Sequence, residues 1–257
     1  MGAPPPTLRA RFAQAAALGR PLVGGHRGNP AQHPENTLAG FRSAIDLGVD
    51  LIECDVHMSA DGRLIVIHDH TLDRTTDGSG LVASHSAAEL RRLDAGDGER
   101  LPFLSEVCEM ARGRVGVCVE LKQLPIAYPE LEERVIDELA RQDVLDDTAV
   151  ISFSHSSVAR IKGLEPRILG GLLMVSRPLD PAALMIAAQA DLFCPHWSAL
   201  DSEVVNSIHA AGGRVGTWTI DDALALSWCE TCQPDSIFTN QPAQMLAEIA
   251  SRPAPPA

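Results

Sequence analysis

Short apolar segments of strand length alternate with helix-like segments along almost the whole chain, and this alternation constrains the fold most. Repeated β-then-α units are typical of a parallel sheet covered by helices. The strand-like segments are residues 21–25, 50–55, 115–121, 148–153, 167–174, 191–195, 214–220 and 236–239. The helix-like segments are 37–47, 104–111, 131–141, 156–163, 181–190, 201–211, 222–230 and 242–251. Eight of each predict an α/β fold, a (β/α)₈ barrel.

The length of the chain fits one such barrel. With 257 residues and 45% hydrophobic composition, the chain can bury one large core, and barrels of about 250 residues usually form a single domain. We expect the barrel at residues 20–251, a tail or short helix at 1–19 and a tail at 252–257. Asn36, which precedes an expected helix, is a good N-cap residue type.

Charge and cysteine usage narrow the range of partners. A net charge of −13 argues against nucleic acids and stable association with anionic membranes, because those surfaces attract clustered Lys and Arg. A small substrate with one phosphate stays compatible, since a local site can oppose the global field. The six cysteines lie mostly in apolar runs and indicate buried thiols, and with no secretory signal we expect a cytoplasmic protein. Cys229 and Cys232 form one isolated CxxC, a weak metal signal.

One segment departs from the simple repeat. After Asp55 the chain continues through residues 56–58, contains an Asp61-Gly62 pair, and returns through the apolar residues 64–67 to His68. An Asp-Gly pair between such runs is a strong hairpin signal. Antiparallel pairing would place His68 close to Asp55. We therefore expect residues 56–103 to form a small hairpin and loop insertion at the barrel mouth after the second strand.

Three carboxylates are expected to converge at that mouth. Glu53 and Asp55 are two apart on one strand, so their side chains share a face, and Glu120 ends the next predicted barrel strand. Like charges about 4 Å apart repel by roughly 4 kcal/mol at an effective dielectric of about 20. Either one divalent cation, Mg²⁺ or Ca²⁺, or pairing with arginine and lysine would relieve this repulsion. Zinc is disfavoured because clustered thiolate and imidazole ligands are missing.

Basic and acid–base groups accompany the carboxylates. Arg27 and Lys122 can bind an anion such as phosphate. His26 and His68 each end an apolar strand, and each is followed by a charged residue that can orient it or bind substrate. Imidazoles in such places can transfer protons near neutral pH. The remaining loop histidines are expected to be ordinary polar surface residues, namely His33, His57, His85 and His209.

These motifs, taken in order, resemble those of the glycerophosphodiester phosphodiesterase family. The matching runs are His26-Arg27-Gly28, Pro34-Glu35-Asn36-Thr37, Glu53-Cys54-Asp55, His68-Asp69, Glu120-Leu121-Lys122, Trp218-Thr219 and Thr239-Asn240-Gln241-Pro242. The resemblance covers about residues 20 to 250 and implies a TIM barrel. It also implies a metal-dependent phosphodiesterase that hydrolyses glycerophosphodiesters to sn-glycerol 3-phosphate and an alcohol.

Residue roles follow from the same resemblance. Glu53, Asp55 and Glu120 would bind the Mg²⁺ or Ca²⁺ ion. Arg27 and Lys122 would stabilise the phosphoryl oxygens. His68 would protonate the leaving alcohol, with His26 on the nucleophile side. The attack comes from the neighbouring glycerol hydroxyl, through a cyclic phosphate, or from water. Trp218 either contacts the substrate glycerol or only packs in the core.

The roles of several residues at the rim of the site are undecided. Where the family often has asparagine this chain has Asp221, and where it often has aspartate this chain has Asn240. The roles of His155 and His196 are undecided too. The insertion is short and mostly polar, which predicts an open mouth and broad specificity for the alcohol.

Three alternatives remain at this stage. A lipid phosphodiesterase of the sphingomyelinase D or phosphatidylinositol phospholipase C type would use a similar site, but no exposed aromatic or apolar loop is expected for membrane docking. A zinc amidohydrolase would use the HxH sequence His68-Asp69-His70, which here follows the second strand rather than the first. A non-catalytic barrel would have lost part of the site, and none is missing. The sequence does not decide the oligomeric state, the cation or the head group.

Overall fold

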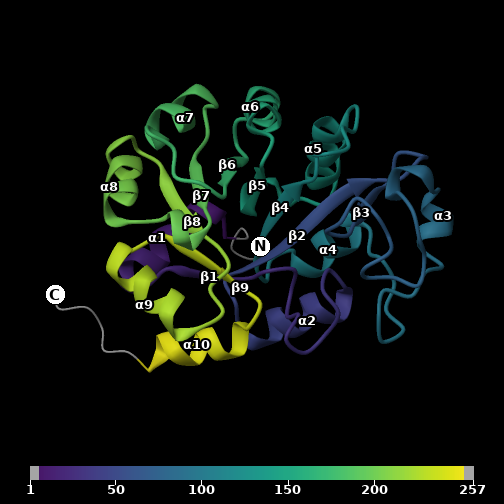
Figure 1. Ribbon diagram of the computed structural model, residues 1–257, viewed down its shortest axis with the longest axis horizontal. Helices are drawn as coiled ribbons and strands as arrows, with labels where there is room; N and C mark the ends of the chain where they lie inside the picture. The colour runs from purple at the N-terminus through teal and green to yellow at the C-terminus, as the bar shows by residue number, and fades with distance from the viewer. Residues whose placement is uncertain (1–5, 252–257) are drawn as a thin grey trace, which may run out of the picture.

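A closed barrel of eight parallel strands forms the centre of the computed structural model, which describes residues 6–251 (Figure 1). The sheet order is β1-β9-β8-β7-β6-β5-β4-β2, and pairing of β1 with β2 closes it. The barrel strands are β1 (Leu22–Gly25), β2 (Leu51–Met58), β4 (Gly116–Leu121), β5 (Thr148–Ser152), β6 (Leu169–Met174), β7 (Leu192–Pro195), β8 (Arg214–Thr217) and β9 (Ser236–Thr239). The predicted (β/α)₈ barrel is confirmed.

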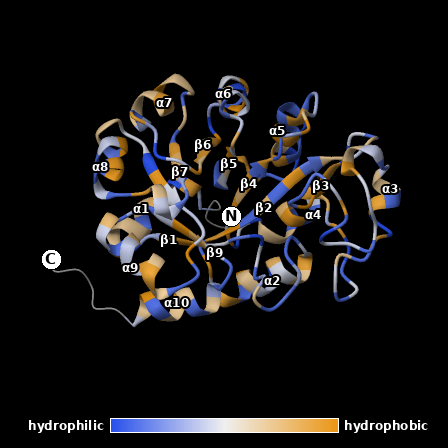
Figure 2. Cartoon of the chain, viewed as in Figure 1, coloured by the Kyte–Doolittle hydropathy of each residue, from blue (hydrophilic) through white to orange (hydrophobic). Residues whose placement is uncertain are grey.

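Helices surround this barrel in the order that the sequence predicts (Figure 1). They are α2 (Leu38–Leu47), α4 (Leu104–Ala111), α5 (Leu131–Arg141), α6 (His155–Leu164), α7 (Pro181–Ala187), α8 (Ser202–Ala210), α9 (Ala223–Cys232) and α10 (Pro242–Ala250). Figure 2 shows hydrophilic and hydrophobic residues mixed along these outer helices, as expected of helices with one face on a core. The largest apolar cluster lies between them and the strands β2, β4 and β5.

The start of α2 shows how a local choice prepares the site. Thr37 is the N-cap, because its side chain accepts a hydrogen bond from the Gly40 amide, and Gly48 ends the helix at φ 90°. The expectation that Asn36 caps this helix is therefore wrong. Asn36 instead adopts a left-handed backbone with φ 57° and donates its side-chain amide to Asp55 Oδ2 at 2.7 Å. The turn at Asn36 thus places a hydrogen-bond donor beside the buried Asp55 carboxylate.

The predicted insertion begins as a hairpin. The strand β3 (Leu64–Val66) pairs antiparallel with β2, with Val56 opposite Val66, outside the closed barrel. The segment continues through η1 (Val82–Ser84) and the short helix α3 (Ala87–Leu90), at the right of Figure 1. It carries a small apolar cluster of its own, made of Ile65, Ile67, Leu72, Val82, Ala87, Leu90, Ala95 and Leu101. The mostly polar insertion is therefore anchored by a local core.

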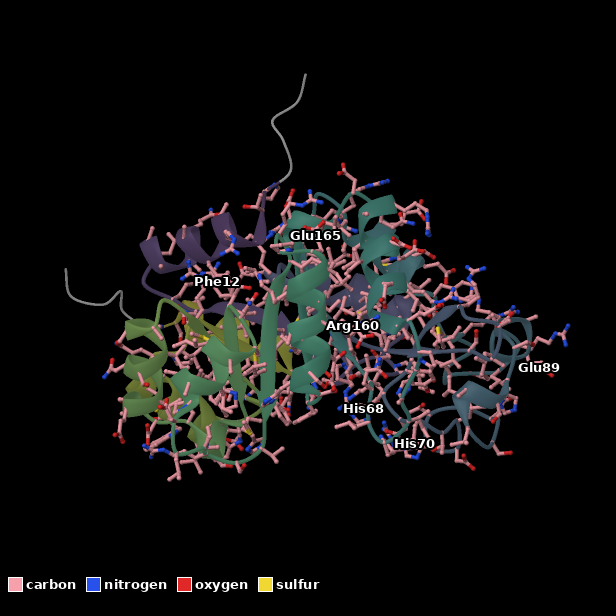
Figure 3. All side chains as sticks on the ribbon, turned by 90° about the horizontal axis from the view of Figure 1, so that it is seen from above. Phe12, His68, His70, Glu89, Arg160 and Glu165 are labelled. Atoms are coloured by element: carbon pink, nitrogen blue, oxygen red, sulfur yellow. The ribbon has the colours of Figure 1, made fainter. Side chains whose placement is uncertain are left out.

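A further helix, α1 (Leu8–Ala17), precedes β1 and packs against the amino-terminal end of the barrel. Its Leu8 and Phe12 are buried in a cluster with side chains from the barrel interior. Arg11 makes two hydrogen bonds, of 2.7 and 2.8 Å, to Asp147, directly before β5. In the view of Figure 3, Phe12 lies toward the upper side of the barrel and His68 toward the lower side. The helix thus covers the end of the barrel away from the predicted site.

The structure also bears on the predictions about the cysteines, exposed apolar residues and the chain ends. All six cysteines are buried and free, which confirms the prediction of buried thiols. Phe153, Val175 and Leu179, which follow β5 and β6, have exposed side chains, so the expectation of no exposed apolar loop is wrong. No helix within residues 6–251 is long and apolar enough to cross a membrane. The predicted tail at 252–257 lies outside the described residues, and the domain limits stay predictions.

Candidate active site

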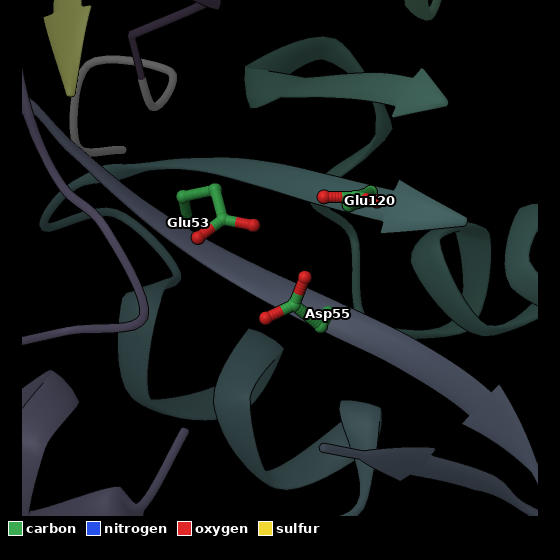
Figure 4. A group of neighbouring side chains, drawn as sticks. All are labelled: Glu53, Asp55 and Glu120. Atoms are coloured by element: carbon green, nitrogen blue, oxygen red, sulfur yellow. The ribbon is translucent and has the colours of Figure 1, made fainter. Parts of the chain in front are cut away.

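The three predicted carboxylates meet at the centre of the barrel mouth. Glu53 and Asp55 are two residues apart on β2, so their side chains share one face. Asp55 is directly opposite Glu120 in the parallel pairing of β2 with β4 (Figure 4). One oxygen from each of the three lies within 4.8 Å of the others, and all three side chains are buried. The spacing of Glu53 and Asp55 along β2 and the register between β2 and β4 therefore bring the three carboxylates together.

Their electrostatics favour a cation. Burial, reinforced by the charges of Asp55 and Glu120, raises the pKa of Glu53 well above its usual value. Burial likewise raises the pKa of Glu120 to about 7, although Lys122 opposes the shift. One Glu53 oxygen accepts from the Arg27 amide, but Oε1 is buried without a hydrogen-bond partner in the described part of the chain. A buried unpaired carboxylate oxygen in an all-oxygen donor set fits a hard divalent cation such as Mg²⁺ or Ca²⁺.

Two basic side chains share the carboxylates. Lys122 Nζ lies 2.6 Å from Glu120 Oε1 and 3.0 Å from Asp55 Oδ1. Arg27 Nε lies 3.4 Å from Asp55 Oδ2. Burial works against the charge of Asp55, but Lys122 and Arg27 outweigh it and hold the pKa of that carboxyl below its usual range. Glu53 Oε1 has no partner among the described residues, so the pairing with arginine and lysine that the sequence offered as an alternative is only partial.

His26 is held by two residues whose role the sequence left open. Its Nδ1 lies 2.8 Å from Asn240 Oδ1. The Asn240 amide nitrogen donates to Asp221 Oδ2 at 2.7 Å, which orients the amide oxygen toward His26. Nδ1 of His26 therefore carries the proton, and Nε2 carries a lone pair. Burial, followed by the charge of Arg27, lowers the pKa of His26 to about 4, so the imidazole is neutral at pH 7.

His68 is held by its sequence neighbour. Its Nδ1 lies 2.6 Å from Asp69 Oδ1, and Arg74 in turn donates to both oxygens of Asp69, at 2.7 and 3.1 Å. Arg74 also makes two hydrogen bonds to Glu35, which pairs with Arg27. Burial lowers the pKa of His68, although Asp55 acts in the opposite direction. A chain of charges thus links the histidine to the phosphate-binding candidates.

His57 is not a surface residue, and that expectation is wrong. Its side chain is buried, and both ring nitrogens have partners: Nδ1 lies 2.9 Å from the Tyr128 hydroxyl and Nε2 lies 3.0 Å from the His68 carbonyl oxygen. Burial lowers the pKa of His57 to about 4. The sequence carried one signal for this placement, because residue 57 continues the alternation of 53 and 55 on β2.

A cavity of about 270 Å³ joins these groups to an apolar wall. Its polar side contains His26, Arg27, Glu53, His68 and Glu120, and its apolar side contains Ile151, Phe153, Leu173, Cys194, Trp218 and Phe238. Asp55 and Lys122 contact the polar side directly, so all eight predicted residues converge. A larger groove between α1, α9 and α10 holds none of them.

Trp218 both lines the cavity and packs against neighbours. Its Nε1 donates to the Cys194 carbonyl at 3.0 Å, and its ring meets Phe153 and His196 edge-on, with centroids 5.8 and 5.2 Å apart. Of the two other rim histidines, His155 Nε2 lies 3.0 Å from the Leu173 carbonyl oxygen. The two interpretations of Trp218, a substrate contact and core packing, are therefore compatible.

Comparison with known proteins gives one consistent result. The model of the glycerophosphoryl diester phosphodiesterase family matches residues 26–244. The chain belongs to this family. It is 33% identical over 233 residues to a glycerophosphodiester phosphodiesterase of Caldanaerobacter subterraneus subsp. tengcongensis, covering 88% of this chain and 96% of that protein. A similar protein from Bacillus altitudinis is also 33% identical, over 84% of this chain and 93% of its own length.

A solved structure agrees with the sequence match. An Oleispira antarctica phosphodiesterase, in complex with the product sn-glycerol-3-phosphate, has a TM-score of 0.81 and 32% identity, covering 90% of this chain and 97% of that one. As a glycerophosphoryl diester phosphodiesterase family member, this chain is an enzyme that hydrolyses phosphodiesters. Membership disfavours the amidohydrolase alternative, and His70, the second histidine of the HxH sequence, is not among the cavity-lining residues.

Proposed function

We propose that this enzyme cleaves glycerophosphodiesters to sn-glycerol 3-phosphate and an alcohol, using one divalent cation and an acid–base pair of His26 and His68. The observation that supports the proposal is one cavity lined by two anchored imidazoles, Arg27 and two carboxylates, with Asp55 and Lys122 paired to these lining groups. Acidic groups alone would suit many metals, and imidazoles alone many hydrolases. Their combination beside Arg27 and Lys122 suits a phosphate ester.

Glu53, Asp55 and Glu120 would hold the cation, either Mg²⁺ or Ca²⁺. Bound there, the ion would neutralise the carboxylates and withdraw charge from the phosphoryl group. Lys122 pairs with Asp55 and Glu120, and Arg27 pairs with Asp55. With the carboxylates neutralised in this way, both side chains would be free to direct their N–H groups to the phosphate oxygens, which would oppose the charge that develops there.

Proton transfer would divide between the histidines. Asn240 fixes the proton of His26 on Nδ1, so Nε2 can accept a proton from the attacking hydroxyl. Asp69 fixes Nδ1–H of His68 and partly opposes the lowering of its pKa by burial, so the protonated imidazole would donate Nε2–H to the leaving alkoxide. Attack by the neighbouring glycerol hydroxyl would leave a cyclic phosphate, whereas attack by water would not. Quenching the first turnover and analysing phosphate by ³¹P NMR separates the two routes.

The apolar wall would accept the carbon skeleton of the substrate. Phe153, Trp218 and Phe238 present ring surfaces rather than hydrogen-bonding groups to the cavity, apart from the Trp218 Nε1, which is already bonded. Such a wall discriminates weakly between small alcohols. We therefore propose broad specificity, and turnover of only one among glycerophosphocholine, glycerophosphoethanolamine and glycerophosphoglycerol would contradict it.

A lipid phosphodiesterase is the second candidate, because Phe153, Val175 and Leu179 are exposed beside the strands that form the apolar wall. The net charge of −13 opposes binding to an anionic bilayer. Lysophosphatidylcholine presented as micelles tests this candidate. Faster turnover of the micellar lipid than of glycerophosphocholine would favour it over the small diester.

The decisive assay measures release of glycerol 3-phosphate from glycerophosphocholine with Mg²⁺, Ca²⁺ or EDTA. We expect cation-dependent release, and a loss of about 10²- to 10⁴-fold in His26→Ala and in His68→Ala. His70→Ala, two residues from His68, is the matched control and should retain wild-type activity. Full activity in EDTA after removal of bound metal would overturn the metal requirement, and an active His68→Ala would overturn the acid–base assignment.

A further inference from the structure

The buried His57 is a polar group that the proposed chemistry does not use. It follows Glu53 and Asp55 on the same face of β2, because side chains two residues apart along a strand point the same way. Both of its ring nitrogens are hydrogen-bonded, to a backbone carbonyl and to a hydroxyl. His57 is thus a fully hydrogen-bonded imidazole near the end of β2, the strand that carries Glu53 and Asp55. Its hydrogen-bond partners indicate which group it positions.

The partners of His57 assign its tautomer. The His68 carbonyl oxygen can only accept, so Nε2 of His57 must carry the proton. Nδ1 is then an acceptor, and the Tyr128 hydroxyl must donate to it. Burial raises the pKa of Tyr128 to about 12, which keeps that hydroxyl protonated. The direction of both hydrogen bonds is thereby fixed, from Tyr128 to His57 to His68.

Tyr128 is itself attached to the strand that carries Glu120. Its amide donates to Gln123 Oε1 at 2.7 Å, and its carbonyl accepts from Gln123 Nε2 at 3.0 Å. Gln123 directly follows Lys122, two residues after the end of β4. The hydrogen bonds therefore run from the end of β4, through the loop at Tyr128, to His57 on β2.

His68 is held at two points by this arrangement. Its side chain is oriented by Asp69, which sets the ring but not the backbone that carries it. Its carbonyl is fixed by His57, and the preceding residue, Ile67, donates its amide to the Asp55 carbonyl at 3.0 Å. Both backbone contacts come from β2, the strand of Glu53 and Asp55. The distance between His68 and the carboxylates is thus set by one strand.

We propose that His57, oriented by Tyr128, is a positioning residue that places His68 over the carboxylate cluster. This inference rests on the proposed function in giving His68 the role of general acid. His57 is not among the cavity-lining residues and would act through the His68 carbonyl. A misplacement of about 1 Å at a reacting group can cost about 10²-fold in rate. Loss of the imidazole should therefore lower kcat and leave substrate and cation binding nearly unchanged.

The test compares His57→Met with His57→Gln. Methionine fills a similar volume without a donor, whereas the glutamine amide can reach the His68 carbonyl in place of Nε2. For His57→Met we expect kcat for glycerophosphocholine to fall about 10- to 100-fold, with KM and the calorimetric Kd for Mn²⁺ within about twofold. For His57→Gln we expect kcat within about threefold of wild type. Equal rates in the two variants, high or low, would overturn the proposal.

A spectroscopic measurement makes the result independent of activity. Tyr128 is the only tyrosine in the chain, so ¹³C labelling at its hydroxyl-bearing carbon gives a single NMR signal. We expect that signal to shift in His57→Met, and the long-range ¹H–¹⁵N spectrum of wild type to show His57 as the Nε2–H tautomer. An Nδ1–H tautomer would overturn the assignment. If His57→Met does not fold, Tyr128→Phe replaces it, and unchanged kcat there would also count against the proposal.

Failure of the proposed function is distinguishable in the same experiment. Wild-type protein that releases no glycerol 3-phosphate with any cation would contradict the proposed reaction, whatever the variants do. Wild-type turnover with an unaffected His57→Met would contradict only the positioning role. The NMR measurement on the wild type tests the assigned tautomer in either case.

Discussion

Lys122 Nζ lies 2.6 Å from Glu120 Oε1, so the lysine occupies the carboxylate that the proposed cation also needs. An ammonium and a divalent cation compete for the same oxygen, and each lowers the benefit of the other. Two functions of Lys122 can therefore be separated: its pairing with the carboxylates and its proposed contact with the phosphate. The first opposes metal binding, whereas the second favours turnover.

Replacing Lys122 by methionine should have opposite effects on these two properties. We expect the affinity for Mn²⁺, measured by calorimetry, to rise, because the carboxylates lose a competing positive charge. We expect kcat/KM to fall by about 10²- to 10³-fold, the scale found when one charge-stabilising donor is removed. Arg114→Met, which removes an exposed ion pair with Asp46, is the control for loss of one positive charge. Weaker metal binding in Lys122→Met would contradict this account.

The benefit of the cation should grow with pH. The folded state raises the pKa of Glu120 from 4.5 to about 7, so between these values it binds a proton that the unfolded chain has lost. Stability of the metal-free protein should therefore fall as pH rises through this window, as far as Glu120 contributes. A divalent cation replaces the proton, so its effect increases above about pH 7.

Thermal melts with EDTA or with Mg²⁺ and Ca²⁺, at about pH 6 and about pH 8, measure this effect. We expect the gain in Tm from the cation to be larger at the higher pH. Glu120→Gln, which cannot release a proton, should reduce both the gain and its pH dependence. The same gain in Tm at both pH values for wild type would show that Glu120 is not titrating against the metal.

Asp69 should control the proton of His68. Asn at this position can donate as well as accept, which allows the proton of the imidazole to move to the wrong nitrogen. We expect Asp69→Asn to lower kcat by about 10²- to 10⁴-fold with little change in Kd for the cation. Asp73→Asn is the matched control, since the Asp73 carboxylate, in the same insertion, accepts a hydrogen bond from the Gly80 amide at 3.0 Å. A kcat near that of wild type in Asp69→Asn would refute the orienting role.

Asp221 and Asn240 should behave as a coupled pair. Asn240→Asp alone would put two carboxylates in contact, because the Asn240 amide nitrogen lies 2.7 Å from Asp221 Oδ2. Combining it with Asp221→Asn restores one donor and one acceptor. The family often has asparagine and aspartate at these two positions, in the reverse order to this chain. We therefore expect both single variants to be impaired and the double variant to recover most of the activity.

The double variant should also change the pH profile. A carboxylate beside Nδ1 raises the pKa of His26 from about 4, because it stabilises the imidazolium. If neutral His26 accepts the proton, activity is lost as pH falls through this pKa, so the acid limb of kcat/KM should move to higher pH. An acid limb at the wild-type position in an active double variant would argue against His26 as base.

The sequence predicted what depends on local pattern. The eight apolar runs became the barrel strands because parallel strands are buried on both faces, and the spacing of Glu53 and Asp55 put both on one face. The specific hydrogen-bond partners of the histidines were not predictable. His57 meets a tyrosine 71 residues away, and His26 meets Asn240 across 214 residues. A histidine that ends up buried and one in solvent look alike until those partners are known.

The position of α1 has a consequence for how substrate enters the site and product leaves it. Leu8 and Phe12 pack against side chains from the barrel interior, so α1 covers the end of the barrel opposite the candidate site. Under the proposed function, substrate and both products would pass the rim of the candidate site, and a glycerol phosphate bound beside the cationic side chains would block the next substrate. Under the proposed function, accumulated product would then slow turnover.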